Sequence, residues 1–266
     1  MEYQHPASRR FLERLASEVL VGDGAMGTLL YNRGVPLEAS FEHLNLVQPE
    51  LVVQVHRDYA QAGAQILETN TFGANALVLG AIGLEKKVAA INAAGVRLAR
   101  QAAGSDRFVA GAVGPLLRPR GETAELSGAD KERIQRHQME ALAEAGADLF
   151  LLETFASLAD LEIAVAIARD LGLPAVAQMA FLQEGQTREG VSAETAAGRL
   201  TAAGATVLGA NCGSGPREML QLLPRLAAAS PLPLSAFANS GFPQLVEGRY
   251  LYLATPEYFA ARGREM

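Results

Sequence analysis

Residues 206–216 read TVLGANCGSGP and place Cys212, the only cysteine among 266 residues, directly after an apolar run. The run Thr206-Val207-Leu208 has the apolar character of a buried strand, and the Gly/Ser/Pro turn after Cys212 leads into a segment with helical spacing. This order predicts the carboxyl end of a strand in a protein that alternates strands and helices, which is where such folds place their chemistry. Because one cysteine is a poor metal site by itself, the role of Cys212 depends on what other strands bring to it.

Six more apolar runs of strand length are spaced along the chain, with cores at residues 19–21, 65–67, 108–110, 149–152, 175–177 and 232–234. They are continuously apolar rather than alternating, which is typical of parallel strands buried on both faces. Between the runs lie segments with helical periodicity, at residues 49–62, 85–103, 130–145, 157–171, 193–203 and 216–229. The sequence therefore predicts a parallel α/β fold built from repeated strand–helix units.

Three of the predicted helices end in the same motif, Ala-Gly-Ala, at residues 62–64, 145–147 and 203–205. Glycine suits the position just after a helix, where a left-handed conformation closes the last turn before the next strand. With a last helix expected at residues 256–262, the chain carries seven strand units. We therefore expect a (β/α)8 (TIM) barrel whose last βα unit is missing from this sequence.

Two further expectations concern organisation. Residues 1–18 are expected to form an N-terminal helical extension, and residues 19–266 the barrel domain, incomplete at its C-terminus. A doubly wound open sheet is the alternative architecture. Its glycine-rich dinucleotide turn is matched only weakly by residues 22–27, GDGAMG, so the barrel is favoured.

The composition argues against several classes of partner. Hydrophobic residues make up 49% of the chain, which is ample for a buried core. The formal net charge is −6 and there is no extended basic run, which argues against nucleic acid as a partner. No apolar stretch approaches the roughly 18 residues of a membrane span. Residues 1–10 lack the apolar core of a signal peptide. A single cysteine fits a reducing compartment, so we expect a cytoplasmic protein.

In a barrel, residues at the carboxyl ends of the strands converge on one rim. The polar residues at these positions are Asp23, Glu68, Thr69, Asn70, Glu153, Thr154, Gln178, Asn211, Cys212 and Asn239. Together these carboxylate, amide and thiol groups suit a binding site for a small zwitterionic ligand. All four histidines lie elsewhere, which argues against a Cys–His nucleophile pair. Simpler interpretations are Cys212 as a small buried residue, Asp23 as part of a turn, and Glu153-Thr154 as a helix cap.

Six motifs follow one another in an order that is not generic. They are residues 23–28 (DGAMGT), 68–72 (ETNTF), 114–115 (GP), 153–155 (ETF), 211–216 (NCGSGP) and 239–243 (NSGFP). Together they resemble the homocysteine S-methyltransferase family, which includes the homocysteine-binding module of methionine synthase, betaine–homocysteine methyltransferases, and bacterial fusions with methylenetetrahydrofolate reductase. The resemblance runs from Val19 to Phe259 and implies the same (β/α)8 barrel.

The resemblance also implies roles for individual residues. The aspartate and glutamate that match Asp23 and Glu153 bind the ammonium group of the substrate. The backbone amides that match Gly24 and Ala25 hold its carboxylate. Asn211 belongs to the expected substrate-binding set, and the expected catalytic residues are Cys212, Glu153 and Asp23.

Zinc is the metal that the resemblance implies, bound in the family by three cysteines. The first of them matches Cys212, and the asparagine that matches Asn239 offers an oxygen to zinc when substrate is absent. The other two form an adjacent pair after the eighth strand, and this sequence has no second cysteine. We therefore expect a fragment of a longer polypeptide whose C-terminal segment supplies the pair, and we expect the fragment alone to be inactive. A degenerate copy is the alternative.

The implied reaction begins with the homocysteine thiol. Zinc binding ionises a thiol at neutral pH, and the thiolate then attacks a methyl group, which gives methionine. The family uses methylcobalamin, methyltetrahydrofolate, betaine or S-methylmethionine as the donor, so methylcobalamin or methyltetrahydrofolate is expected through other domains. One alternative is a catalytically silent barrel that binds an amino acid or serves as a scaffold. Another is an unrelated lyase or aldolase barrel, which would normally carry a lysine at a strand end, where this chain has none.

Overall fold

The structure is a computed structural model that describes residue 3 and residues 5–117, 125–213, 215–241, 244–246, 249–251 and 254–266. Ser214 and the Phe242-Pro243 pair, which belong to two of the motifs, lie outside the described residues. The chain divides into two compact units. Unit 1 is Met1–Leu151 with Ile167–Pro174, and unit 2 is Leu152–Ala166 with Ala175–Met266.

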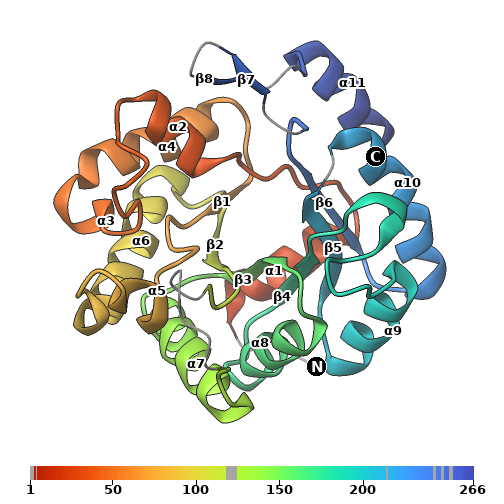
Figure 1. Ribbon diagram of the computed structural model, residues 1–266, viewed down its shortest axis with the longest axis horizontal. Coiled ribbons are helices and arrows are strands. Elements are labelled where there is room, and N and C mark those ends of the chain that lie inside the picture. Colours follow the sequence, from red (N-terminus) through yellow and green to blue (C-terminus); the bar gives the residue numbers. More distant parts are fainter. Residues whose placement is uncertain are drawn as a thin grey trace. The chain divides into compact units, whose positions relative to one another are not determined.

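Six strands form one sheet in chain order (Figure 1). They are β1 (Ile66–Glu68), β2 (Phe108–Val113), β3 (Leu149–Phe155), β4 (Ala175–Met179), β5 (Val207–Cys212) and β6 (Leu234–Ala238). The registers of β1–β2, β4–β5 and β5–β6 are parallel. Strand β3 belongs to both units, because Leu149–Leu151 lie in unit 1 and the rest of the strand lies in unit 2. These elements confirm a parallel α/β fold, and closure into eight βα units stays a prediction.

Helices alternate with the strands as the periodicity predicts. The larger ones are α1 (Pro6–Leu15), α4 (Pro49–Gln61), α6 (Val88–Ala103), α7 (Gly128–Glu144), α8 (Leu158–Asp170), α9 (Ala193–Ala203), α10 (Pro216–Ala229) and α11 (Pro256–Glu265). The shorter ones are α2 (Met26–Asn32), α3 (Leu44–Val47), α5 (Ala76–Gly80) and the 3-10 turns η1 (Glu85–Lys87) and η2 (Gln183–Gly185). The predicted bounds of α9 and α10 agree with the structure at both ends. No helix in the described part of the chain is long and apolar enough to span a membrane.

The Ala-Gly-Ala motifs end helices in the predicted way. Gly63, Gly146 and Gly204 follow α4, α7 and α9, with φ of +106°, +93° and +98°. An L side chain is disfavoured in this left-handed region, so glycine allows the chain to leave the helix and enter the next strand within a few residues.

The prediction of a strand at residues 19–21 is wrong. Val19 is 88% exposed and Val21 56% exposed, so this run is not buried on both faces. The segment makes one isolated parallel bridge, Gly22 to Ile66, and the Val21 carbonyl accepts from the amide of Gln65 at 2.7 Å. It therefore accompanies β1 without forming a regular strand.

Unit 1 is built on β1, β2 and the start of β3. Strand β2 is buried along its whole length, and helices α4 and α6 pack against each other and against β1 (Figure 1). The N-terminal helix α1 also belongs to this core. Phe11 meets Phe108 edge-on with ring centroids 5.4 Å apart, and the Ser8 hydroxyl donates to the Asp148 carbonyl at 2.8 Å.

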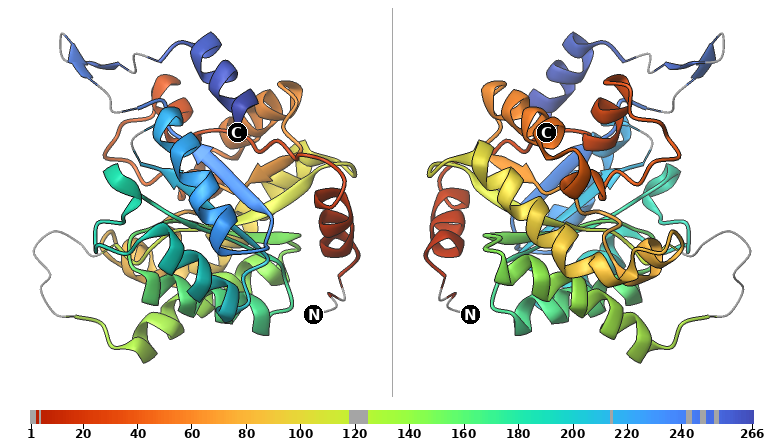
Figure 2. Two further views of the ribbon diagram at one scale, coloured as in Figure 1. Left: turned by 90° about the vertical axis from the view of Figure 1, so that its right-hand side faces the viewer. Right: turned by 90° about the vertical axis from the view of Figure 1, so that its left-hand side faces the viewer.

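Unit 2 contains the end of β3, strands β4–β6, and helices α9–α11. Helices α9 and α10 pack against each other, and both contact β5 (Figure 1). Gln178, Gly209 and Ser235 share one register across β4, β5 and β6. The Gln178 amide donates to the Ser235 hydroxyl at 2.7 Å. A two-stranded hairpin of β7 (Gln244–Val246) and β8 (Arg249–Leu251) lies outside the main sheet (Figure 2).

Candidate active site at the ends of β3 and β5

The carboxyl ends of β3 and β5 both leave the sheet through a strained residue. Thr154 has φ of +63° and Cys212 has φ of +56°, values that L residues rarely adopt. For a β-branched residue such as threonine this is an outlier, and such conformations persist only where surrounding contacts hold them. Unit 2 therefore stores backbone strain at the ends of two strands that are separated in the sheet order by β4.

Asn211 ties these two strand ends together. Its Oδ1 accepts from the backbone amide of Thr154 at 2.6 Å, and its Nδ2 donates to Thr154 Oγ1 at 2.7 Å. The same Nδ2 lies 3.2 Å from Glu153 Oε2 and 3.6 Å from Cys212 Sγ. Asn211 is buried at 1% exposure, so its polar atoms contact these four neighbouring groups rather than solvent. The structure thus brings Glu153, Asn211 and Cys212 together.

Burial changes the acidity of both reactive groups in this cluster. It raises the pKa of Glu153 to about 7, because the ionised carboxylate loses water. It also raises the pKa of the Cys212 thiol. A hydrogen bond with Thr154, whose Oγ1 lies 3.6 Å from Sγ, acts in the opposite direction on the thiol pKa, and the nearby charge of Glu153 raises that pKa further.

Asn239 lies after β6 and contacts the loop that follows Cys212. Its Nδ2 donates to the Gly213 carbonyl at 3.0 Å, and its Oδ1 accepts from the amide of Gly241 at 3.3 Å. These contacts place the predicted zinc-facing asparagine next to the backbone of residue 213.

Asp23, Gly24 and Ala25 belong to unit 1, where they form the turn before α2. Asp23 Oδ2 accepts from the amide of Glu68 at 2.9 Å, which joins the turn to the end of β1. A Cβ on Gly24 would lie 2.8 Å from Tyr59 Cε1, so any larger residue would require the tyrosine ring to move. The Tyr59 hydroxyl donates to the Ala25 carbonyl at 3.2 Å. Burial, then the carboxylates of Asp23 and Glu68, raise the pKa of Tyr59 to about 12.

Three other polar residues predicted at strand ends serve internal contacts. Thr69, Asn70 and Gln178 are 3%, 6% and 1% exposed. Asn70 donates to the Phe41 carbonyl at 2.6 Å, and Thr69 Oγ1 accepts from the amide of Ala112 at 3.0 Å. These side chains position the backbone of the strand ends.

Sequence reasoning missed two contacts near the predicted residues. Tyr59 lies on α4, and its place over Gly24 has no signature in the sequence. Thr154 was identified as a strand-end residue, but its contact with Cys212 depends on a backbone conformation that the ETF motif does not reveal.

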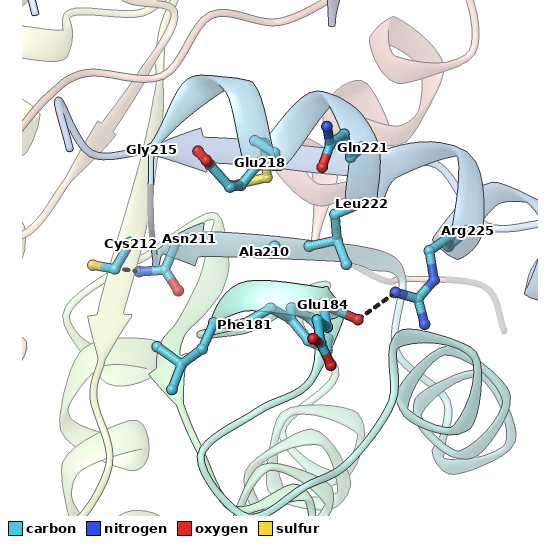
Figure 3. Close-up of a pocket in the computed structure, with 13 residues that line it drawn as sticks. Phe181, Glu184, Ala210, Asn211, Cys212, Gly215, Glu218, Gln221, Leu222 and Arg225 are labelled. Atoms are coloured by element: carbon cyan, nitrogen blue, oxygen red, sulfur yellow. Dashed lines mark hydrogen bonds between the residues drawn. The ribbon is translucent and has the colours of Figure 1, made fainter.

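A cavity of about 250 Å³ lies in unit 2 beside Cys212 (Figure 3). Ala210, Met219 and Leu222 give it an apolar lining between β5 and α10, while Glu218 and Arg225 contribute charged groups. Arg225 donates to the Glu184 carbonyl at 2.7 Å across one end. In Figure 3 the sulfur of Cys212 points away from the other labelled residues.

The described residues contain no group of three or more His, Cys, Asp or Glu side chains that could hold a metal ion. Cys212 is the sole thiol of the sequence. Catalytic zinc sites use three protein ligands, commonly thiolates or imidazoles. The residues that the structure describes therefore offer Cys212 as their one thiol and form no complete zinc site.

Comparisons with known proteins agree with the motifs. A family model for homocysteine S-methyltransferase matches residues 20–266. Methionine synthase from Mycobacterium leprae (strain TN) is 31% identical over 264 residues, which cover 91% of this chain but only 22% of that protein. S-methylmethionine–homocysteine S-methyltransferase BHMT2 from Pongo abelii is 31% identical over 230 residues, covering 82% of this chain and 59% of that protein.

Solved structures give the same result. The oxidized form of the homocysteine methyltransferase MmuM from Escherichia coli is 29% identical, with a TM-score of 0.77, and the match covers 89% of this chain and 87% of that one. The metallated form of the same enzyme gives a TM-score of 0.74 at 28% identity. On the family match over almost its whole length, this chain belongs to the homocysteine S-methyltransferase family.

Proposed function

We propose that this chain binds homocysteine and presents its thiol for methylation to methionine. The observation that carries the proposal is the shared contact of Glu153 Oε2 and Cys212 Sγ with one nitrogen atom, Asn211 Nδ2, at 3.2 and 3.6 Å. Homocysteine has an ammonium group at one end and a thiol at the other. A partly buried carboxylate beside a cysteine sulfur matches both ends, and family membership supplies the substrate class.

Glu153 is the proposed partner of the substrate ammonium. Above a pH of about 7 it is ionised, and a carboxylate in a partly desolvated site makes a strong charge-assisted hydrogen bond to an ammonium group. Asp23 is also proposed to bind the substrate ammonium group, and this proposal is based on the family motif alone. Its place in unit 1 is fixed by the contact with the Glu68 amide.

The amides of Gly24 and Ala25 are proposed to hold the substrate carboxylate. Helix α2 begins at Met26, and its N-cap residue, Ala25, provides no side-chain cap. The first amides of such a helix favour an anion. The close packing of Tyr59 over Gly24 and its bond to the Ala25 carbonyl support a rigid turn here.

Zinc, which the family resemblance implies, would make the substrate thiol a nucleophile at neutral pH. Cys212 is the one thiolate that this chain offers. Asn239 Oδ1 already accepts from the Gly241 amide. This donor set alone does not fit a catalytic zinc, and the roles proposed for Glu153, Gly24 and Ala25 rest only on this chain's own groups.

The methyl donor is proposed to reach the thiol from another part of the protein or a partner. The chain spans 22% of the length of the methionine synthase it matches. Methylcobalamin or methyltetrahydrofolate, bound by other domains, is the donor class that this relationship favours. The transfer forms the sulfur–methyl bond, breaks the bond between the methyl group and its carrier, and releases the thiol proton.

A binding experiment tests the proposal. L-homocysteine and L-homoserine differ only in a sulfur or an oxygen, so calorimetric titration of the complete gene product with each separates thiol recognition from amino-acid recognition. We expect homocysteine to bind at least about tenfold more tightly, and Cys212→Ser to abolish the preference. Equal affinities in the unsubstituted protein would instead support a silent amino-acid-binding barrel and refute the proposal.

A further inference from the structure

The orientation of the Asn211 side-chain amide follows from one backbone group. The Thr154 N–H can only donate, and it lies 2.6 Å from Asn211 Oδ1. The opposite face of the amide must therefore be the NH2 group, which points at Thr154 Oγ1, Glu153 Oε2 and Cys212 Sγ. The direction of each hydrogen bond that Asn211 makes is thus determined.

A count of protons then assigns the Thr154 hydroxyl. Thr154 Oγ1 accepts from Asn211 Nδ2 at 2.7 Å, so its own hydrogen is left for another acceptor. Cys212 Sγ lies 3.6 Å from that oxygen, within the range of a hydrogen bond to sulfur. Asn211 Nδ2 carries only two hydrogens, and Thr154 Oγ1 at 2.7 Å and Glu153 Oε2 at 3.2 Å lie nearer to it than Cys212 Sγ at 3.6 Å. The Thr154 hydroxyl is therefore the hydrogen-bond partner left for the sulfur.

The backbone of Thr154 makes this geometry possible. In the left-handed region the residue turns out of the path of β3, and the 2.6 Å bond to Asn211 Oδ1 stabilises that turn. Cys212 is left-handed as well, at the end of β5. Thr154 and Cys212 thus both have a strained backbone conformation, and the buried amide of Asn211 contacts both residues. Neither conformation would persist without such contacts.

We propose that Thr154 is a positioning residue for Cys212, whose hydroxyl holds the sulfur toward the end of β3 and away from the neighbouring cavity between β5 and α10. Only the kinetic part of the test below rests on the proposed function. Asn211 and Cys212 also line that cavity, and in Figure 3 the sulfur points away from the other labelled lining residues. Methyl transfer requires the attacking sulfur to approach in line with the bond to the methyl carrier. The groups around that sulfur, Cys212 among them, must therefore have a fixed orientation.

Alkylation of Cys212 by iodoacetamide tests the positioning on this chain, where it is the only thiol. The rate is measured without metal, on the plateau at high pH where the thiol is fully ionised. Thr154→Val keeps the branched shape of the side chain but loses the hydroxyl. We expect it to raise the plateau alkylation rate about fivefold, which is the effect of losing one ordinary hydrogen bond. Thr154→Ser keeps the hydroxyl and should stay within about twofold of the parent chain.

Thr154→Gly provides the second variant. It removes the hydroxyl but also relieves the positive φ, so it stays folded even if the valine variant does not. We expect its plateau rate to follow that of Thr154→Val. Parent-like rates in both the valine and the glycine variants would overturn the proposal, and so would a serine variant altered as much as the valine variant.

The kinetic part uses the complete gene product. Thr154→Val should lower kcat for homocysteine methylation while leaving KM for homocysteine unchanged, and Thr154→Ser should restore kcat. A raised KM with unchanged kcat would overturn the positioning role. If the unsubstituted protein does not methylate homocysteine, the proposed function fails, and the alkylation rates still decide whether Thr154 positions Cys212.

Discussion

Two glutamates of unit 2 show how strongly the environment of a single residue governs its chemistry. Burial raises the pKa of Glu153 to about 7. The hydrogen bonds from Arg225 lower the pKa of Glu194 to about 2. Glu194 is therefore a permanent surface anion, whereas Glu153 changes its charge near neutral pH. A buried carboxyl group whose pKa is raised in this way is typical of a functional site.

The first prediction follows from the ionisation of Glu153. Because only the carboxylate can hold an ammonium group, kcat/KM for homocysteine should fall as the pH decreases through about 7. Glu153→Gln should lower kcat/KM by roughly tenfold to a hundredfold and remove this step from the pH profile. The measurement is kcat/KM of the complete gene product across the neutral pH range.

Glu162→Gln is the matched control for that profile. Glu162 lies on α8 in unit 2 and pairs with Arg199 at the surface, so its loss should leave both the level and the pH dependence of kcat/KM unchanged. A Glu153→Gln variant with the parent's pH profile would show that Glu153 does not bind the substrate.

At the scale of elements, the segment that follows β1 is held by buried amides. Asn45 of α3 donates to the Asn70 carbonyl at 2.8 Å and to the Ile91 carbonyl at 3.2 Å. Asn70 donates to Asn45 Oδ1 at 3.0 Å. Asn45 is 3% exposed, so these bonds replace contacts with water that are no longer available. The network fixes the end of β1 against α3 and α6.

The second prediction concerns this network. Asn45→Ala should lower the free energy of unfolding by about 2–4 kcal/mol, because it leaves two buried carbonyl groups without their donor. Asn32→Ala, at the exposed end of α2, should change it by about 0.5 kcal/mol or less. Urea unfolding of both variants measures the difference. Equal stability of the two variants would mean that the Asn45 bonds contribute nothing.

Helices could be predicted closely from the sequence because their signals are local. Apolar spacing, Pro216 at the start of α10 and Gly204 after α9 each act within one turn of the residue concerned. The strand at residues 19–21 failed because Val19 and Val21 have strand-like side chains but lie exposed. Burial depends on neighbours from elsewhere in the chain, which composition does not reveal.

The site residues stay a prediction, and the structure adds contacts among them that the sequence does not reveal. The motifs identified Glu153, Asn211 and Cys212, which the structure brings together. The left-handed backbone of Thr154 could not be predicted, since threonine disfavours it and only tertiary hydrogen bonds maintain it. Tyr59 was missed for a similar reason, because its contact with Ala25 joins residues 34 positions apart.

At the scale of the whole molecule, the prediction concerns zinc, the metal that the family resemblance implies. One thiolate cannot supply the ~10–16 kcal/mol that a full ligand set gives to bound zinc. We predict that these 266 residues alone do not retain stoichiometric zinc after dialysis. Extending the chain with a segment that carries an adjacent Cys-Cys pair should restore it. Atomic absorption measures the zinc content of both chains. Stoichiometric zinc on the unextended chain would contradict the assignment of Cys212 as one ligand of three.

The central claim is that Cys212 and its neighbours present homocysteine for methylation. The most direct measurement is methionine formation by the complete gene product from homocysteine and a methyl donor, with methylcobalamin, methyltetrahydrofolate and S-methylmethionine supplied in parallel. The account predicts homocysteine-dependent methionine with at least one donor, and a loss of about a thousandfold or more in Cys212→Ser. Full activity in Cys212→Ser, or no methionine with any donor, would contradict it.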